Sequence, residues 1–344
     1  MRTSLCFVCF AALAMLSCEG AGRSDGAGDT DTGSVGDGDA GGDADADADS
    51  DSDSDPDTGT ATQSDNGCTN LDILFVLDDS SSMVEEQTNL ADNFPKFIDV
   101  INAYETPQHD KLDYRIGVTV VGVTRNFKWK VMGVPLPAST TGPDGDLQGQ
   151  SKCALGPHPW LAGPGPNVTD TFSCMADVGT SGSGGEMPWA ALELALGEKM
   201  QAGGANEGFY GKDDDSLLVV VMITDEDDCS IEEGGTMTVS AKGASDCDEA
   251  TSTGLYKAAD VKQFLDDVAG GAGRYVVVGI GGAKPGGCTS TFGDANYAKR
   301  LKELTDACQG YGFFGDICKG DLWESLKSAL DIITVSCENI PPVE

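Results

Sequence analysis

The stretch "LDILFVLDDSSSM", residues 71 to 83, decides the predicted fold. Its five consecutive apolar residues, from Ile73 to Leu77, are typical of a strand that is buried on both faces of a sheet. Two acids and three serines follow directly, so oxygen-bearing side chains are predicted to cluster at the carboxyl end of this strand. A second run, "LLVVVMIT" at residues 217 to 224, ends in the same way on Asp225 and three further acids.

Buried strands of this kind recur along the chain and alternate with amphipathic helical patterns. The alternation predicts an α/β fold with a doubly wound, mostly parallel sheet and helices on both faces. A weaker alternating run at 126–132 is predicted to be an edge strand, and a short last strand is expected within 311–317. The four main strands are predicted at Leu71–Leu77, Tyr114–Val121, Leu217–Thr224 and Tyr275–Ile280.

The folded domain is predicted to span residues 68 to 344. Two segments interrupt its alternation of strands and helices. Residues 133–178 are rich in Gly, Pro and Ser, and residues 228–250 follow the second acidic strand end. Each segment carries two cysteines, so both are predicted to be loop insertions stapled by a disulfide. Long loops on a rigid scaffold often determine specificity, and Trp160 in the first insertion is a candidate for a contact surface.

The composition of residues 1–18 predicts that the protein is exported. Arg2 precedes an apolar run that is too short to span a membrane and that ends on Ser17 and Cys18. This ending resembles the lipobox of bacterial lipoproteins, which implies that Cys18 carries the acyl chains. Glu19, by resemblance to enterobacterial sorting, favours the outer membrane or the cell surface. Ordinary secretion, with a periplasmic or free protein, is the alternative.

Residues 19–67 are predicted to be a disordered, acidic linker. Between Asp25 and Asp65 the chain has 14 Asp and neither Lys nor Arg. Such a segment buries too little apolar surface to fold, and its like charges repel one another. A loose Ca²⁺-responsive element is the alternative interpretation, although the regular glycine and the terminal Glu of an EF-hand are absent.

Nine cysteines follow residue 18, and an exported protein is expected to join them in disulfides. Proximity in the sequence favours Cys153 with Cys174 and Cys229 with Cys247. Two further cysteines, Cys68 and Cys337, flank the domain and are predicted to clamp its ends. Of the remaining three, Cys288 is predicted to pair with Cys318, because Cys308 lies within a helical pattern and is left as the odd thiol.

The formal net charge of −36 restricts the partners of the chain. Nucleic acids and anionic membrane surfaces both require a basic footprint, so neither is expected to be a partner, and contact with a membrane is expected through the lipid anchor only. Cations and basic partners are favoured instead.

Three pieces of the sequence together predict a metal site. Asp78, Ser80 and Ser82 stand at every second position after the first strand, and Asp225 follows the strand at 217–224. A Gly-rich loop before a helix adds the hydroxyl of Thr180. Ligands bind beyond the carboxyl ends of strands in open α/β sheets. Carboxylates and hydroxyls without His or Cys suit Mg²⁺, Mn²⁺ or Ca²⁺ better than zinc.

The order of these pieces resembles a von Willebrand factor type A domain with its metal-ion-dependent adhesion site. The family pattern is Asp-x-Ser-x-Ser after the first strand, a Thr in a later loop and an Asp after a further strand. The resemblance implies that the hydroxyls contact the ion, that the aspartates often act through water, and that a protein ligand completes the coordination with an Asp or Glu carboxylate. Within the Thr180 loop, Ser181 and Ser183 are alternative donors.

Other acids crowd the same predicted rim. They are either solvated loop side chains or ligands of a second cation. Glu186 is expected to interact favourably with the dipole of the helix that follows it, and a contact with the metal through water is the less favoured alternative. The crowding acids are Asp79, Glu226, Asp227 and Asp228.

Three functions are compatible with these residues. The first is a surface-anchored module that binds a divalent cation and, through it, an acidic group of an unknown protein ligand. The second is a scaffold without a working metal site that serves as a structural or interaction protein of the envelope. The third, a metal-dependent hydrolase, is disfavoured, because the chain has two His and neither a Gly-x-Ser-x-Gly elbow nor a phosphate-binding Gly-Lys-Ser/Thr loop. The protein is therefore not expected to be an enzyme.

Overall fold

The computed structural model describes residues 67–105, 110–211, 213, 215–238, 247, 249–320 and 322–341. The predicted signal peptide at 1–18, the acylation site Cys18 and all of the predicted linker except Gly67 lie outside these residues, so they stay predictions. No helix in the described ranges combines the length and the apolar character that crossing a membrane requires.

A six-stranded sheet forms the centre of the domain, in the order β12-β9-β6-β1-β2-β5. Its inner strands consist almost entirely of buried apolar residues, which explains why they lie inside a sheet that is covered on both faces. The strands are β1 (Asn70–Leu77), β2 (Asp113–Val120), β5 (Leu161–Gly163), β6 (Ser216–Ile223), β9 (Tyr275–Gly281) and β12 (Gly312–Asp316).

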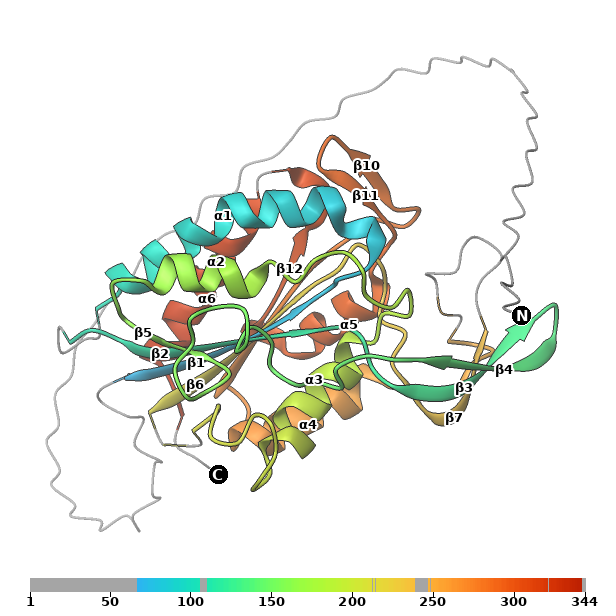
Figure 1. Cartoon of the computed structure of the whole chain (residues 1–344), viewed down its shortest axis with the longest axis horizontal. Helices are drawn as coiled ribbons and strands as arrows, with labels where there is room; N and C mark the ends of the chain where they lie inside the picture. The colour runs from blue at the N-terminus through green and yellow to red at the C-terminus, as the bar shows by residue number, and fades with distance from the viewer. Residues whose placement is uncertain are drawn as a thin grey trace, which may run out of the picture. The chain divides into compact units, whose positions relative to one another are not determined.

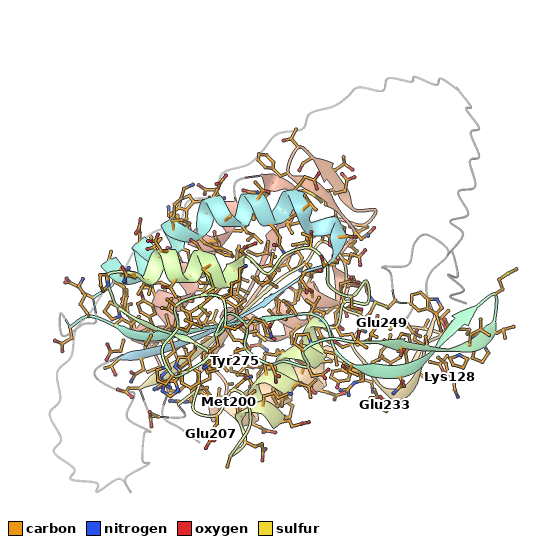
Figure 2. All side chains as sticks on the ribbon, in the orientation of Figure 1. Lys128, Met200, Glu207, Glu233, Glu249 and Tyr275 are labelled. Atoms are coloured by element: carbon orange, nitrogen blue, oxygen red, sulfur yellow. A yellow bond between two sulfur atoms is a disulfide. The ribbon has the colours of Figure 1, made fainter. Side chains whose placement is uncertain are left out.

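Helices cover both faces of this sheet (Figure 1). Alternate residues of β1 point to opposite cores, so that Phe75 packs against the rings of Phe94 and Phe172, whereas Leu74 belongs to the core of the other face. Tyr275 is buried in that second core (Figure 2). The first core contains residues of α1 (Val84–Ala103), α2 (Val168–Ala176) and α6 (Leu322–Glu338), and the second those of α3 (Pro188–Leu196), α4 (Ala258–Ala269) and α5 (Lys299–Ala307).

A second sheet of four strands lies beside the first, in the order β4-β3-β7-β8. Its strands are β3 (Arg125–Val131), β4 (Val134–Thr140), β7 (Ile231–Thr238) and β8 (Thr253–Leu255). A separate hairpin joins β10 (Cys288–Ser290) and β11 (Gly293–Ala295), and the short 3₁₀ helices are η1 (Ser81–Met83), η2 (Glu198–Met200), η3 (Gln309–Tyr311) and η4 (Ile317–Lys319).

The predicted fold class, a doubly wound and mostly parallel sheet, is wrong. Among the described residues, five strand pairings are parallel and four are antiparallel. The antiparallel pairings include the whole β3–β4 hairpin and the pairing of β5 with the edge strand β2. The domain is therefore a mixed α and β structure with three sheets.

The two predicted loop insertions contain much of this additional structure. Residues 133–178 form β4, β5 and α2, and residues 228–250 contain β7. The run at 126–132, predicted to be an edge strand, is β3, which lies between β4 and β7 in the second sheet. Pairing with a distant strand satisfies backbone groups that would otherwise need water, and hydrophobic periodicity does not reveal such a pairing.

All four predicted disulfides are confirmed. The pairs are Cys68–Cys337, Cys153–Cys174, Cys229–Cys247 and Cys288–Cys318. The odd thiol is Cys308, as predicted, and it is buried.

Candidate functional site

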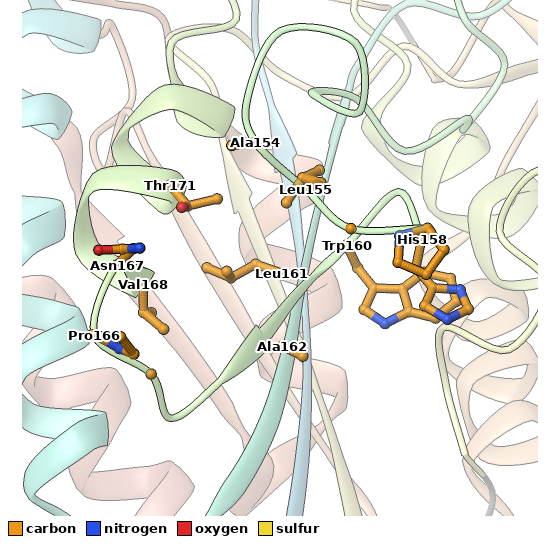
Figure 3. Close-up of a pocket in the computed structure, with 13 residues that line it drawn as sticks. Ala154, Leu155, His158, Trp160, Leu161, Ala162, Pro166, Asn167, Val168 and Thr171 are labelled. Atoms are coloured by element: carbon orange, nitrogen blue, oxygen red, sulfur yellow. The ribbon is translucent and has the colours of Figure 1, made fainter.

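Two hollows contain residues that the sequence singles out, and the first lies in the 133–178 segment. It has a volume of about 310 Å³ and is lined by residues of 154–171 (Figure 3). Trp160, predicted as a contact surface, is 8% exposed, since its ring stacks on His158 at 4.4 Å between centroids and packs against Phe209. This prediction is wrong, because Trp160 supports the loop rather than offering its ring to a partner.

The predicted metal site begins where β1 and β6 end side by side. Leu77 and Ile223 are register partners in these parallel strands, so the next residues, Asp78 and Thr224, are neighbours. The backbone N–H of Asp78 donates to the Ile223 carbonyl at 2.9 Å, and the Thr224 hydroxyl donates to Asp78 Oδ2 at 2.8 Å. The other oxygen, Oδ1, accepts from the backbone N–H of Ser80 at 2.8 Å. The buried carboxylate of Asp78 is thereby fixed in one orientation.

The two serines of the motif lie next to each other, and one of them, Ser80, contacts Asp78. Ser80 and Ser82 place their hydroxyl oxygens 2.9 Å apart. Ser80 is buried and Ser82 is exposed, so the pair leads from the interior to the surface of the rim. Asp225 lines the same hollow as Ser82. Burial raises the pKa of Asp225, and the Ser82 hydroxyl acts in the opposite direction. Four of the five predicted ligands are thus neighbours.

Thr180, the fifth predicted ligand, lies in a loop that is bonded to the motif on both of its sides. Gln87 Nε2 donates to the carbonyl of Asp78 at 2.9 Å and to the carbonyl of Gly179 at 2.8 Å. Two residues after Thr180, the backbone N–H of Gly182 donates to the Asp79 carbonyl at 2.7 Å. A side chain at Gly182 would displace the Asp79 carboxylate, so glycine favours the present position of this rim acid.

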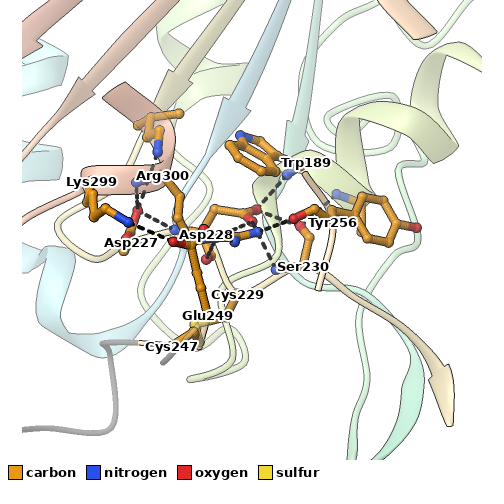
Figure 4. A network of polar contacts seen from close by, with 12 residues as sticks. Trp189, Asp227, Asp228, Cys229, Ser230, Cys247, Glu249, Tyr256, Lys299 and Arg300 are labelled. Atoms are coloured by element: carbon orange, nitrogen blue, oxygen red, sulfur yellow. Dashed lines mark hydrogen bonds and ion pairs between the residues drawn. A yellow bond between two sulfur atoms is a disulfide. The ribbon is translucent and has the colours of Figure 1, made fainter. Parts of the chain in front are cut away.

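A buried ion pair holds the loop that presents Asp225 (Figure 4). Arg300, at the start of α5, is 2% exposed and contacts Asp228 Oδ2 at 3.0 Å and Glu249 Oε1 at 2.7 Å. Its guanidinium also lies 4.7 Å from the centroid of the Trp189 ring. Asp228 accepts in turn from the backbone N–H of Trp189 at 3.1 Å. The pair therefore connects the loop to α3 and α5.

Asp227 and Asp228 are consequently not the solvated rim acids that one interpretation of the sequence suggested. Both are buried, and Asp227 Oδ1 accepts from the backbone N–H of Arg300 at 2.8 Å, at the start of α5. Arg300 already neutralises Asp228, which also argues against a second cation there. Asp79 and Glu226 remain half-buried on the rim.

Burial raises the pKa of four acids in this cluster. Burial, together with the charges of Asp78 and Glu226, raises the pKa of Asp225 to about 8. Burial, with the hydrogen bond and charge of Glu226, raises the pKa of Glu186 to about 10. Burial also raises the pKa of Asp78, and together with the charge of Asp78 it raises that of Asp79 to about 6. Among the described residues, the neighbours whose charges act most strongly on these groups are themselves acids.

This cluster meets the requirements of a hard divalent cation. In the described part of the chain, one oxygen each of Asp79, Glu186 and Asp225 is buried without a hydrogen-bond partner. A buried acceptor without a partner is costly, and a buried carboxylate is normally paired or bound to a metal. Carboxylate and hydroxyl oxygens together form the ligand set of Mg²⁺, Mn²⁺ or Ca²⁺. The residues present therefore fit such an ion.

An open hollow of about 430 Å³ adjoins the cluster and has room for the side chain of a partner. Ser82, Asp225 and Glu226 line one part of it, and residues 286–289 and 294–296 around the β10–β11 hairpin line the rest. A different trio, Cys288, Asp316 and Cys318, also brings metal-ligating atoms together, but its two sulfurs are joined in a disulfide. That trio does not offer a thiolate to a metal.

Two supporting residues were not predicted from the sequence. Thr224 ends the predicted strand at 217–224. Its place beside Asp225 is the signal that it could support the site. Gln87 lies on α1, and the sequence carries no signal that it would reach two loops. Glu186 is a buried acid of the cluster, and its predicted interaction with the helix dipole stays a prediction.

Comparisons with known proteins do not assign a family. No protein-family model matches the chain, and no curated protein matches it. Among solved structures, proximal thread matrix protein 1 from the mussel byssus is 12% identical, with a TM-score of 0.40, over 78% of this chain and 49% of that one. The pilus adhesin SpaC of Lactobacillus rhamnosus GG is 11% identical, with a TM-score of 0.39, over 79% and 31% of the two chains.

The pilus adhesin RrgA of Streptococcus pneumoniae is 11% identical, with a TM-score of 0.32, over 77% of this chain and 45% of the adhesin. The present chain therefore spans less than half of each of these three proteins. At TM-scores below 0.5 these similarities do not assign a function.

Proposed function

We propose that the rim formed by Asp78, Ser80, Ser82, Thr180 and Asp225 binds one divalent cation and, through it, a carboxylate of a protein partner. The observation that supports this most strongly is the buried carboxylate cluster, in which, among the described residues, oxygens of Asp79, Glu186 and Asp225 have no hydrogen-bond partner and the strongest charged neighbours are acids. A divalent cation is the simplest counter-charge for such a cluster.

The donor set also supports the choice of partner. Three of the five proposed ligands are neutral hydroxyls, so the ion keeps much of its positive charge and attracts a further anion. The adjoining hollow of about 430 Å³ admits a side chain. The von Willebrand factor type A pattern, which the motif resembles, implies the same use of an external Asp or Glu.

Exposure on a cell surface fits this proposal. Four disulfides are typical of an oxidising compartment and hence of an exported protein. In this view Cys18 anchors the chain by lipid, and residues 19–67 act as a spacer. Absence of catalysis stays a prediction, as does the identity of the partner.

Titration calorimetry with Mg²⁺ and Mn²⁺ tests the cation site. The wild-type protein is expected to bind, whereas Asp78→Ala and Ser82→Ala are expected to lose at least about tenfold in affinity, since each removes an oxygen from the site or its support. Asp92→Ala removes an exposed acid from α1 and serves as the matched control. Equal heats for wild type and Asp78→Ala would overturn the proposal.

Capture of partners from envelope extracts, with and without EDTA, tests the second step. Capture that depends on the cation and is lost in Asp78→Ala supports the proposal. Binding that survives EDTA would favour the alternative of a scaffold without a working metal site.

A further inference from the structure

The β3–β4 hairpin carries an exposed apolar tip that the metal site does not explain. It extends from the main body of the domain and ends in the turn at Met132 and Gly133 (Figure 1). We propose that this hairpin tip, defined as Met132, Val134 and Leu136, inserts into the interface of a lipid membrane with anionic headgroups. The proposal is independent of the cation site.

The turn itself departs from the usual local rules. Met132 and Gly133 have φ angles of 49° and 82°, which is the two-residue pattern of positive φ that tight hairpins use. Asn is favoured at the first of these positions, and a long apolar side chain is unusual there. Yet the Met132 side chain is 98% exposed. Departures from local preference that leave an apolar group in water are expected at functional positions.

The two faces of the hairpin differ in character. The register pairs Trp129 with Leu136 and Lys130 with Pro135, and paired residues share a face. One face is therefore apolar and the other carries Lys128 and Lys130. The apolar face is covered at its base, where Phe127 is 5% exposed, and open toward the end, where Val134 and Leu136 are 56% and 49% exposed.

The outer edge of the hairpin is closed to another strand. Pro135 and Pro137 lack the N–H that a strand ladder needs, so their positions must face away from β3. An approaching chain would therefore find two of its acceptors without donors. The tip, rather than the edge, remains as the binding element.

The spacing of the lysines matches the depth of a membrane interface. At about 3.4 Å per residue, Lys130 and Lys128 lie roughly 7 and 14 Å behind Met132. Interfacial segments bury their apolar side chains about 5–10 Å deep, and lysines behind them extend to the phosphates. Trp129, between the two lysines, is of the residue type that concentrates at this level. Figure 2 labels Lys128 on the hairpin.

The acidity of the whole chain does not prevent this approach. Glu233 on β7 is bonded to Asn126 at the base of the hairpin, away from the tip. Asn126, which contacts Glu233, lies four residues and so roughly 14 Å behind Lys130. This separation exceeds the Debye length of about 8 Å at physiological salt, so the charge of Glu233 is largely screened at Lys130.

A membrane suits the tip better than a second copy of the chain. Three side chains cover far less than the roughly 800 Å² per partner that a stable protein interface buries. Two identical hairpins would also bring their lysines together. A lipid interface requires neither a matching shape nor a large area.

Vesicle co-sedimentation tests the inference with the full chain carrying Cys18→Ser, so that acylation cannot contribute. Binding is expected to vesicles of equal parts phosphatidylcholine and phosphatidylglycerol, in EDTA, and to be weaker for phosphatidylcholine alone. Met132→Ser, Val134→Ser and Leu136→Ser combined are expected to reduce binding by more than about tenfold. Lys128→Gln with Lys130→Gln is expected to cost about fivefold per lysine and to weaken the salt dependence.

The combined control Val100→Ser and Val335→Ser changes exposed valines on α1 and α6 and should leave binding unchanged. The inference is overturned if wild type does not bind the vesicles, or if the tip variant binds as well as wild type. Binding that EDTA abolishes would assign the interaction to the cation site instead. A dimer that the tip substitutions dissociate would identify a second copy as the occupant and would also overturn it.

Discussion

Arg300 and Lys299 are neighbours in sequence and both contact Glu249, yet their environments differ. Arg300 is 2% exposed and also contacts the fully buried Asp228, whereas the Lys299 side chain is 49% exposed. A comparison of these two adjacent cations, which share one partner, therefore distinguishes the contribution of a buried ion pair to stability from that of a surface pair.

Substitution of Arg300 by Met is expected to destabilise the protein by about 3–5 kcal/mol, because it leaves the carboxylate of Asp228 buried without its partner. Lys299→Met, the matched control, is expected to cost less than about 1 kcal/mol, since water solvates Glu249 when Lys299 is lost. Urea unfolding of the two variants measures both values. Equal losses would show that Arg300 does not act as a buried counter-charge.

At the scale of elements, the rim joins the ends of β1 and β6 to the loop before α3. Its acids are buried and also repel one another, and both effects link stability to pH. The pKa of Asp79 is raised to about 6 and that of Asp225 to about 8, chiefly by burial. Both values lie above the value near 4 that is expected in the unfolded chain. The folded protein therefore binds more protons than the unfolded chain.

The metal-free protein is accordingly expected to lose stability as the pH rises from about 4 to about 8. The contribution of these groups is fully present below the unfolded pKa and is lost as the pH passes the folded values. Because a cation replaces the missing protons, saturating Mg²⁺ should raise Tm more at about pH 8 than at about pH 5. Calorimetric scans with Mg²⁺ and with EDTA measure this difference. A larger Mg²⁺ effect at the lower pH would contradict a cation bound by these carboxylates.

Some elements could be predicted from the sequence and others could not, for physical reasons. The predicted Leu71–Leu77 and Tyr275–Ile280 agree closely with β1 and β9, because strands buried on both faces are continuous apolar runs. In contrast, β7 has the sequence IEEGGTMT and is mostly exposed or half-buried. Its pairing with β3 is not visible in local periodicity, and the second sheet was therefore missed.

The same distinction applies to the candidate site. Asp78, Ser80, Ser82 and Asp225 could be proposed because a strand end is visible in the sequence, and parallel strands end at a common edge. The burial of Asp228 could not be predicted, because it depends on the contact of this loop with Arg300 on α5. The sequence thus identifies the oxygen donors, and tertiary packing determines which acids are free to bind an ion.

At the scale of the whole domain, the four-stranded sheet is connected to the six-stranded sheet at the edge where the strands β2 and β6 end. β3 follows the end of β2, and β7 follows the end of β6, so the second sheet begins where the candidate metal site lies. At the start of β1, Cys68 is joined to Cys337 at the end of α6, and the Cys68 N–H donates to the Cys337 carbonyl at 2.8 Å. The two ends of the described fold are therefore fixed to each other.

This terminal disulfide is expected to stabilise the protein more than the local disulfides do. The Cys68–Cys337 bond joins residues separated by 269 positions, and Cys153–Cys174 joins residues separated by 21. Loop-closure entropy in the unfolded chain predicts losses of about 6 and about 3 kcal/mol, respectively, when each pair is replaced by Ser. Urea unfolding of the two double variants measures this order. The reverse order would indicate that the end of α6 detaches without unfolding the sheet, so that β1 is held by its neighbouring strands β2 and β6 alone.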